Sequence, residues 1–148
     1  MAQVTGVIVI DRPVDLVFDF VADERNEPLY NRHLLRSEMV TPGPIGLGSR
    51  FRAFHSQGHG DVEMAIEYTG YVRPRRLSSK TTMSWAEVDG ALTFAPKGAA
   101  TELRWAWDVR PKGAARILTP FIGPIGRRTE NACWEGLKRY LEHGGGGG

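Results

Sequence analysis

Few side chains in this sequence could carry out chemistry, and most of those lie on segments whose pattern predicts strands. The four histidines are His33, His55, His59 and His143, and His55 and His59 are four residues apart. On a helix this spacing would place two metal ligands on one face, but here it falls on a predicted strand and turn. We therefore expect no metal site and no cofactor.

Nucleophilic and carboxylate mechanisms have little support in the sequence. The single cysteine, Cys133, lies on the apolar side of a predicted helix, which favours a buried structural thiol. The sequence contains no G-x-S-x-G nucleophile elbow and no phosphate-binding loop. Glu63, Glu67, Asp89 and Asp108 fall on outward registers of predicted strands, so a catalytic pair of carboxylates is not expected.

His55 and Tyr68 are the two candidates for proton transfer, because both fall on inward registers of predicted strands. A cyclase or dehydratase needs a base near an acidic C–H group and a donor near a carbonyl oxygen. His55 also lies beside a predicted turn at 57–60, where it would be solvated. Tyr68 could instead be hydrogen bonded within the core. A catalytic role for either residue is therefore a hypothesis.

One long amphipathic helix, predicted over 114–142, is the main element that must position these residues. Pro120 and Pro124 interrupt its first half, so we expect a kink or short break near Gly123 and Pro124. A broad apolar stripe of this kind must pack on another element. The stripe consists of residues at steps of three and four: Leu118, Phe121, Ile122, Ile125, Thr129, Ala132, Cys133, Gly136, Leu137 and Tyr140.

Most of the remaining chain shows the period of two that is typical of strands. Strands are predicted over 3–10, 33–41, 49–56, 61–71, 77–85, 87–94 and 101–109. Two short helices are expected after the first strand, at 14–22 and from 23 to about 31. Short turns join the last six strands, which predicts an antiparallel meander. The element order predicts an α+β fold with a curved sheet of about seven strands wrapped around the C-terminal helix.

Length and composition are those of one globular domain. The chain has 148 residues, of which 41% are hydrophobic and 24% charged, so we expect a domain over 1–142 and a flexible glycine tail over 143–148. The net charge of +2 and the short basic clusters at 73–76 and 127–128 predict no nucleic-acid surface. A lone cysteine, no visible signal peptide and no membrane-spanning run predict a cytoplasmic protein.

Several stretches together resemble one family over about residues 3 to 142. They are VIVIDRPVDLVFDFVADERNEPLYN, GLGSRFRA, YTGYVRPRRLSSKTTMS, GALTFAP, ATELRWAWDVRP and WEGLKRYLE. The sequence resembles the SRPBCC (START-like, helix-grip) superfamily, in particular its polyketide cyclase/dehydrase branch. The resemblance implies a deep cavity between the sheet and the C-terminal helix. It also implies binding or transformation of lipids, sterols, polyketides or other hydrophobic small molecules.

The predicted registers supply the residues that would line such a cavity. Cavities of this kind are mostly apolar, with a few polar groups that fix the orientation of the ligand. The expected ligand-binding residues are Tyr30, Met64, Ile66, Tyr68, Thr81, Met83, Trp85, Leu92, Trp105, Trp107, Phe121, Ile125 and Thr129. Any of them could instead be an ordinary core residue, Trp105 and Trp107 in particular.

Three functions remain open from the sequence. The first is cofactor-free binding of a hydrophobic small molecule such as a lipid, sterol or polyketide-like compound. The second is a polyketide cyclase or dehydratase that uses the same cavity, with His55 or Tyr68 transferring protons. The third is an interaction or stress-response module whose cavity is incidental. The expected partner is a small molecule, with no nucleic acid and no membrane span, and the chain could be a monomer or a homodimer.

Overall fold

Seven antiparallel strands form one open sheet, and a long helix lies across its inner face. A computed structural model describes residues 2–56 and 61–143 of the chain. In chain order the elements are β1 (Ala2–Ile10), α1 (Val14–Ala22), η1 (Glu24–Leu29), β2 (Leu34–Met39), β3 (Arg50–Ser56), β4 (Asp61–Val72), β5 (Arg76–Met83), β6 (Ala86–Lys97), β7 (Ala100–Pro111), η2 (Gly113–Leu118) and α2 (Thr119–Glu142). The elements η1 and η2 are short 3-10 helices.

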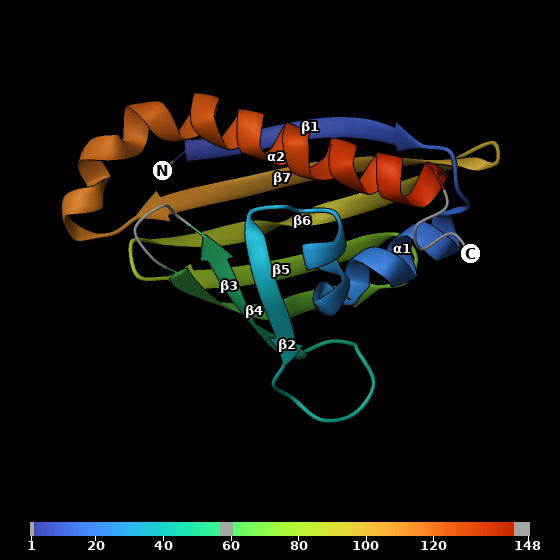
Figure 1. Cartoon of the computed structure of the whole chain (residues 1–148), viewed down its shortest axis with the longest axis horizontal. Helices are drawn as coiled ribbons and strands as arrows, with labels where there is room; N and C mark the ends of the chain where they lie inside the picture. The colour runs from blue at the N-terminus through green and yellow to red at the C-terminus, as the bar shows by residue number, and fades with distance from the viewer. Residues whose placement is uncertain (1, 57–60, 144–148) are drawn as a thin grey trace.

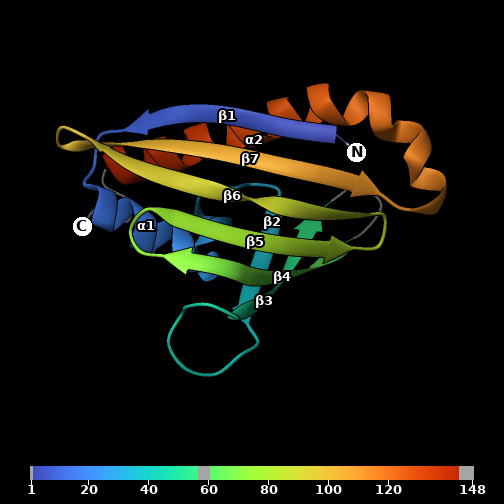
Figure 2. The ribbon, with the colours of Figure 1, turned by 180° about the vertical axis from the view of Figure 1, so that it is seen from behind.

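The strand order in the sheet is β1-β7-β6-β5-β4-β3-β2, so β2 to β7 form the predicted meander and β1 pairs with β7. Figure 1 shows α1 and α2 in front of the sheet. Figure 2, turned by 180°, shows the sheet in front of both helices, so they cover the same face. The predicted α+β helix-grip fold is confirmed.

Alternating side chains explain why the sheet has one buried face. In β3, Phe51 and Ala53 are buried while Arg50 and Arg52 are exposed, which is the pattern of a strand with one solvated side. The main difference from the predicted strands is the β6–β7 hairpin. Its pairing continues to Lys97 opposite Ala100, and the turn is tightened by Gly98, whose positive φ of 63° suits a residue without a Cβ atom.

The C-terminal helix begins later than predicted. Residues Gly113–Leu118 form η2, and α2 begins at Thr119 and continues through Pro124 without a break. Figure 1 shows the chain turning where η2 passes into α2. Pro120 lies in the first turn of α2, where its missing N–H group has no intrahelical partner to lose. The expected interruption at Gly123 and Pro124 therefore lies at Leu118 instead.

The predicted apolar stripe of α2 is partly wrong. Phe121, Ile125, Thr129 and Ala132 are exposed, although they share the predicted face. The buried residues of the helix are Ile122, Cys133, Trp134, Leu137 and Leu141. The physical reason is that only the C-terminal half of α2 packs on the main core, whereas its N-terminal half lies beside a cavity and solvent.

Two glycines let α2 lie close to its neighbours. A Cβ atom at Gly126 would lie 2.8 Å from Cγ2 of Val4 on β1. A Cβ atom at Gly136 would overlap the carbonyl oxygen of Tyr30, just after η1. Both close approaches fix where α2 and η1 lie relative to the sheet, and this placement shapes the space between them.

The core consists of two buried clusters. The larger joins α1, the sheet and the C-terminal half of α2, and includes Phe18, Phe51, Tyr68, Phe94 and Leu137. The smaller consists of Val4, Ala86, Val109 and Ile122. Residues of both clusters face a cavity on the inner side of the sheet. Residues 144–148 of the tail predicted over 143–148, and the predicted turn at 57–60, lie outside the described residues.

Candidate ligand cavity

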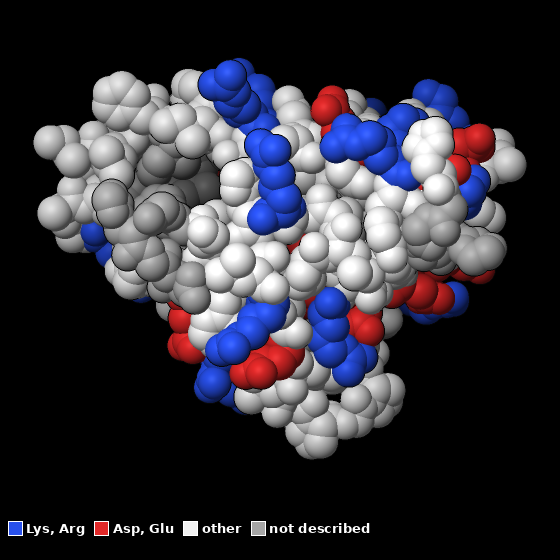
Figure 3. Space-filling view, in the orientation of Figure 1, with Lys and Arg blue, Asp and Glu red and all other residues white. Residues whose placement is uncertain are grey.

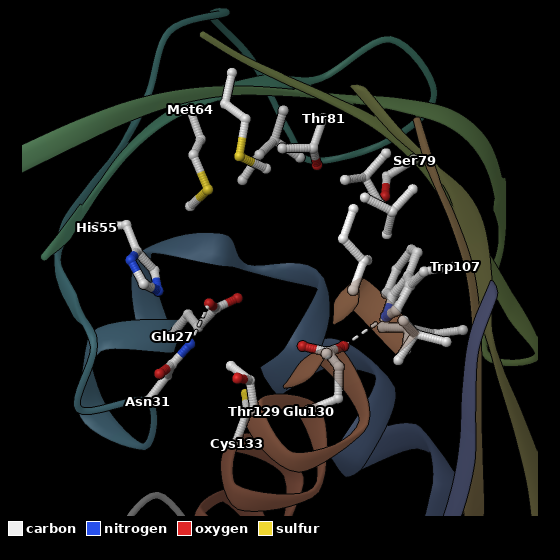
Figure 4. Close-up of a pocket in the computed structure, with 18 of the residues that line it drawn as sticks. Glu27, Asn31, His55, Met64, Ser79, Thr81, Trp107, Thr129, Glu130 and Cys133 are labelled. Carbon is white, nitrogen blue, oxygen red and sulfur yellow. Dashed lines mark hydrogen bonds between the residues drawn. The ribbon is translucent and has the colours of Figure 1, made fainter. Parts of the chain in front are cut away.

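A cavity of about 440 Å³ lies between the inner face of the sheet and α2. Residues of β1 and β3 to β7 form one wall, and η1 and α2 contribute the other (Figure 4). Most of the lining is apolar, which is typical of sites for hydrophobic ligands.

Most of the expected ligand-binding residues line this cavity. They are Met64, Ile66, Tyr68, Thr81, Met83, Trp85, Leu92, Trp107, Phe121, Ile125 and Thr129. Strand alternation places the strand members on the inner face, and the first turns of α2 bring Phe121, Ile125 and Thr129 to the same space. Their contact with a ligand stays a prediction.

Trp105 and Tyr30 do not line the cavity. Trp105 is 2% exposed and stacks on Trp134, with ring centroids 5.8 Å apart. Although Trp105 and Trp107 share a face of β7, Trp105 lies under the part of α2 that fills the core. Tyr30 packs between Phe20 and Trp134, with centroid distances of 6.0 and 6.2 Å, and borders a separate depression beside the end of α2.

His55 lies on the cavity wall, as its register predicted. Its ring stacks on that of His33, with centroids 5.9 Å apart. Burial, reinforced by His33, lowers the pKa of His55, so the imidazole is neutral at pH 7. Its Nδ1 atom is buried and has no hydrogen-bond partner among the described residues. A neutral imidazole with a free ring nitrogen could accept a proton or a hydrogen bond from a ligand.

Tyr68 is tied to the backbone. Its hydroxyl donates a 2.6 Å hydrogen bond to the carbonyl oxygen of Ala22, the last residue of α1. Burial raises the pKa of Tyr68 well above its usual value, so the hydroxyl keeps its proton. The hydroxyl proton is therefore engaged in holding the end of α1, which weakens the hypothesis that Tyr68 donates to a substrate.

Three glutamates in the lining were missed by the sequence analysis, which expected no carboxylate pair. Glu24 and Glu27 come from η1, and Glu130 comes from α2. Asp23 starts η1 by accepting a 3.1 Å hydrogen bond from the backbone N–H group of Arg25. The short helix then presents Glu24 and Glu27 to the cavity. We call these three residues, Glu24, Glu27 and Glu130, the acidic cluster.

Glu130 is held by two tryptophans. Its Oε1 atom accepts hydrogen bonds from Nε1 of Trp107 at 2.5 Å and Nε1 of Trp134 at 3.3 Å. Burial, with a smaller contribution from Glu27, raises the pKa of Glu130 to about 7. Figure 4 shows the Glu130 carboxyl group pointing into the cavity beside Thr129 and Cys133. It can therefore exchange a proton near neutral pH.

Glu24 and Glu27 form a pair. Burial raises the pKa of both groups, and that of Glu24 is raised further by the nearby carboxyl group of Glu27. Glu27 also accepts a 3.0 Å hydrogen bond from Nδ2 of Asn31. The Oε2 atom of Glu24 is buried without a hydrogen-bond partner among the described residues. The cavity therefore contains carboxyl oxygens that lack donors.

Cys133 and the outward carboxylates lie where they were expected. Cys133 is a buried free thiol whose pKa is raised well above its usual value, mainly by burial, so it stays protonated. None of Glu63, Glu67, Asp89 and Asp108 lines the described part of the cavity. Within residues 2–56 and 61–143, no three His, Cys, Asp or Glu side chains are placed so that they could hold a metal ion together.

One signal in the sequence could have found Glu130. Ile122, Gly126, Glu130, Cys133 and Leu137 follow helical steps of four, four, three and four, so Gly126 and Glu130 share one row of the helix with three members of the predicted stripe. Its one charged member is Glu130. The residues of η1 offer no such periodicity, because six residues are too few to define a buried face.

Surface charge does not form a continuous band on the face drawn in Figure 3, where Lys and Arg side chains are interspersed with Asp and Glu. Part of the basic cluster at 73–76 is paired, since Arg73 forms a 2.7 Å ion pair with Asp19. This agrees with the expectation of no nucleic-acid surface, which stays a prediction. No helix in the described part of the chain is long and apolar enough to cross a membrane.

Several solved structures have a similar fold. A protein of Thermus thermophilus is 15% identical, with a TM-score of 0.78 over 95% of this chain and 97% of that one. The Zhui aromatase/cyclase of Streptomyces sp. R1128 is 15% identical, with a TM-score of 0.75 over 97% and 98%. A START superfamily protein of Mycobacterium smegmatis is 15% identical, with a TM-score of 0.72 over 97% and 96%.

Sequence comparison gives a more specific result than these low identities, which show the fold alone. A search of the curated proteins found no match. The model of one family, described as "Polyketide cyclase / dehydrase and lipid transport", matches residues 1–142. That match includes the strands, η1 and α2 that build the cavity. The chain therefore belongs to the polyketide cyclase/dehydrase and lipid transport family, as its resemblance to the SRPBCC superfamily implied.

Proposed function

We propose that this protein binds a hydrophobic small molecule in the cavity between the sheet and α2. The observation that carries the proposal is the cavity itself, whose volume of about 440 Å³ and mostly apolar lining match those of small-molecule sites. An apolar ligand would be stabilised there by removal of its surface from water. Membership of a family described by cyclase, dehydrase and lipid-transport activities supports the same site.

The mouth of the cavity supports entry of an apolar molecule. Leu118, Phe121 and Ile125 line the cavity and are also 48%, 59% and 63% exposed. Apolar side chains that face both solvent and the cavity form a path along which a ligand can enter. Single exposed apolar residues need no explanation, but a group at a cavity mouth is typical of a binding site.

The first test is native mass spectrometry of the freshly purified protein, followed by extraction and identification of any bound molecule. Titration with an apolar fluorescent probe then measures affinity directly. An empty protein that also fails to bind the probe would contradict the proposal and favour the interaction module with an incidental cavity.

A matched pair of variants locates the binding site. Thr81 lines the cavity, whereas Thr82, the next residue of β5, is exposed on the opposite face. Thr81→Phe should fill the cavity and weaken probe binding by about tenfold or more, equivalent to about 1.4 kcal/mol. Thr82→Phe should bind the probe like the wild type. Equal affinities of two folded variants would place the probe elsewhere.

A second function, cyclase or dehydratase activity, is favoured by the proton-exchanging groups of the cavity. Glu130 has a pKa of about 7, and the Nδ1 atom of the neutral His55 has no hydrogen-bond partner among the described residues. An acid and a base beside an apolar substrate are what cyclisation and dehydration require. Mass spectrometry of a polyketide-like substrate should show loss of water, abolished in His55→Ala and Glu130→Gln. Tyr68→Phe tests the remaining sequence-derived candidate.

A further inference from the structure

The groups of the cavity that can carry a charge at pH 7 are all acidic. Glu24, Glu27 and Glu130 belong to the lining, and no Lys or Arg is among the described residues that line it. The basic side chain that does line the cavity, His55, has a lowered pKa and carries no charge at pH 7. No side chain in the described lining therefore neutralises the acidic cluster.

The acidic cluster also lacks hydrogen-bond donors. An ionised carboxyl group can accept about four hydrogen bonds. Glu130 receives two, both on Oε1, and Glu27 receives one from Asn31. Oε2 of Glu24 is buried and receives none from the described residues. A buried acceptor without a donor is unfavourable, so a ligand that supplies donors would be stabilised here.

The indole N–H group of Trp85, a donor in the lining, does not bind these carboxyl groups. Nε1 of Trp85 is buried without a partner among the described residues, but Trp85 packs against the smaller core cluster of Val4, Ala86, Val109 and Ile122. A bound molecule that brings donors can therefore supply what the acidic cluster lacks.

The carboxyl groups of the cavity lie on one side only, whereas Ser79 and Thr81 bring neutral hydroxyl groups to the side of the sheet. Figure 4 shows Glu27, Asn31 and Glu130 on the side of η1 and α2, and Met64 and Thr81 on the opposite side, under the sheet. A molecule in this space would place its apolar body along the sheet and its polar group toward η1 and α2. The polar group would then lie among the carboxyl groups of the acidic cluster.

We infer that the cavity selects an apolar molecule whose polar group is a protonated amine, held by Glu24, Glu27 and Glu130, and disfavours molecules that end in a carboxylate. An ammonium group brings three donors and the positive charge that the lining lacks. A carboxylate would add a like charge to the cluster without a donor. This inference rests on the proposed binding function and specifies its ligand class.

The test compares three probes with the same hydrocarbon chain: decylamine, decan-1-ol and decanoate. Competition with an apolar fluorescent probe at pH 7 gives the three affinities. We expect decylamine to bind about tenfold or more tightly than decan-1-ol, and decanoate to bind most weakly. The ratio of amine to alcohol affinity cancels the common apolar contribution and reports on the polar group alone.

Matched glutamine variants assign the preference to the cluster. Glu130→Gln and Glu27→Gln should each reduce the ratio of amine to alcohol affinity toward one. Glu135→Gln, an exposed position on the same helix, should leave the ratio unchanged. Two cluster variants are used because each can be checked for folding independently.

The pH dependence of the wild type provides a measurement that needs no variant. Protonation of the cluster on lowering the pH from 8 to 5 should weaken decylamine binding by about tenfold for each carboxylate charge lost, and a tenfold change corresponds to about 1.4 kcal/mol. Decan-1-ol, which has no charge, should show a much smaller change. The other titratable groups of the lining are His55, Tyr68 and Cys133. The Tyr68 hydroxyl and the Cys133 thiol stay protonated throughout this range, because burial raises the pKa of both.

The outcomes separate the two proposals. Binding of decan-1-ol or decanoate as tightly as decylamine would overturn the amine preference and leave the proposed function standing. An unchanged ratio in both folded cluster variants would do the same. Failure of all three probes to bind would overturn the proposed function, and the amine preference with it.

Discussion

At the scale of single residues, the unusual feature is a buried carboxyl group that stabilises the fold only when it is protonated. Glu130 has a pKa of about 7 in the folded protein, against 4.5 for an unperturbed glutamate. The folded state therefore binds its proton more tightly than the unfolded chain does. This contribution to stability is complete below about pH 4.5 and is lost as the pH rises through 7.

Replacing Glu130 by glutamine should therefore flatten the dependence of stability on pH. A shift from 4.5 to about 7 corresponds to up to about 3 kcal/mol in the free energy of unfolding. Glutamine keeps an oxygen that can accept the hydrogen bond from Trp107. Denaturant unfolding between pH 4 and pH 8 should show Glu130→Gln more stable than the wild type above pH 7.

Glu24 and Glu27 contribute the same sign of pH dependence in the Glu130 variant, because burial is the largest cause that raises the pKa of each. Only the difference between the variant and the wild type reports on Glu130. Glu135→Gln should follow the wild-type curve at every pH. Parallel curves for Glu130→Gln and the wild type would show that Glu130 is not perturbed.

Tyr68 permits a second prediction about a single group. Tyr68→Phe removes the donor to the carbonyl oxygen of Ala22 and leaves that buried acceptor unpaired. We expect a loss of about 1–3 kcal/mol in the free energy of unfolding, measured by urea denaturation. Tyr71→Phe is the control, since no described residue hydrogen bonds to its hydroxyl and it packs beside Tyr68. Equal losses in both variants would contradict the argument.

At the scale of elements, the cavity depends on how closely α2 lies to β1 and η1. Close approach at Gly126 and Gly136 brings the helix to the side chain of Val4 and the backbone of Tyr30. The same helix presents Glu130 toward Trp107 of β7. The position of the helix thus decides both the width of the cavity and the placement of its acidic side.

Alanine substitutions at two glycines of α2 should change the stability of the fold in opposite directions. Gly136→Ala places a methyl group against the carbonyl oxygen of Tyr30, and overpacking of this kind destabilises by about 1–3 kcal/mol. Gly123→Ala has nothing within 4 Å of the new Cβ atom and should gain up to about 1 kcal/mol from helix propensity. Thermal unfolding of both variants measures the contrast. If Gly136→Ala unfolds at the same temperature as the wild type, η1 can move away from α2 without loss of stability.

At the scale of the whole molecule, one helix cannot cover the whole inner face of a seven-stranded sheet. The uncovered part of that face borders the cavity. Residues of the larger and of the smaller core cluster both line that cavity. An empty apolar cavity forfeits contacts that a ligand would restore. Occupancy should therefore stabilise the entire domain rather than one element.

Binding of an apolar ligand should raise the melting temperature by an amount that grows with the logarithm of the free ligand concentration above its Kd. At a free concentration one hundred times its Kd, a ligand specific for the folded state adds about 2.7 kcal/mol. In a domain of this size that corresponds to about 5–10 °C. Differential scanning fluorimetry should show this shift for the wild type and Thr82→Phe, and a much smaller one for Thr81→Phe.

How much of this could be predicted from the sequence depends on the range of the interactions involved. Strand alternation and short turns are local, so the meander, α1 and most of the sheet wall of the cavity were predictable. The alternation could not distinguish Trp105 from Trp107, because they share a face of β7. Trp105 is buried in the core and Trp107 lines the cavity, because different parts of α2 lie above them.

The sequence by itself determined the α+β fold, the order of its elements and the apolar character of the inner face, since those follow from local periodicity. The tertiary structure alone decided the rotation of α2 and the placement of η1. These bring Glu24 and Glu27 within reach of Glu130, more than a hundred residues later in the chain. The physical reason is that packing between distant segments, rather than local propensity, sets the chemistry of the cavity.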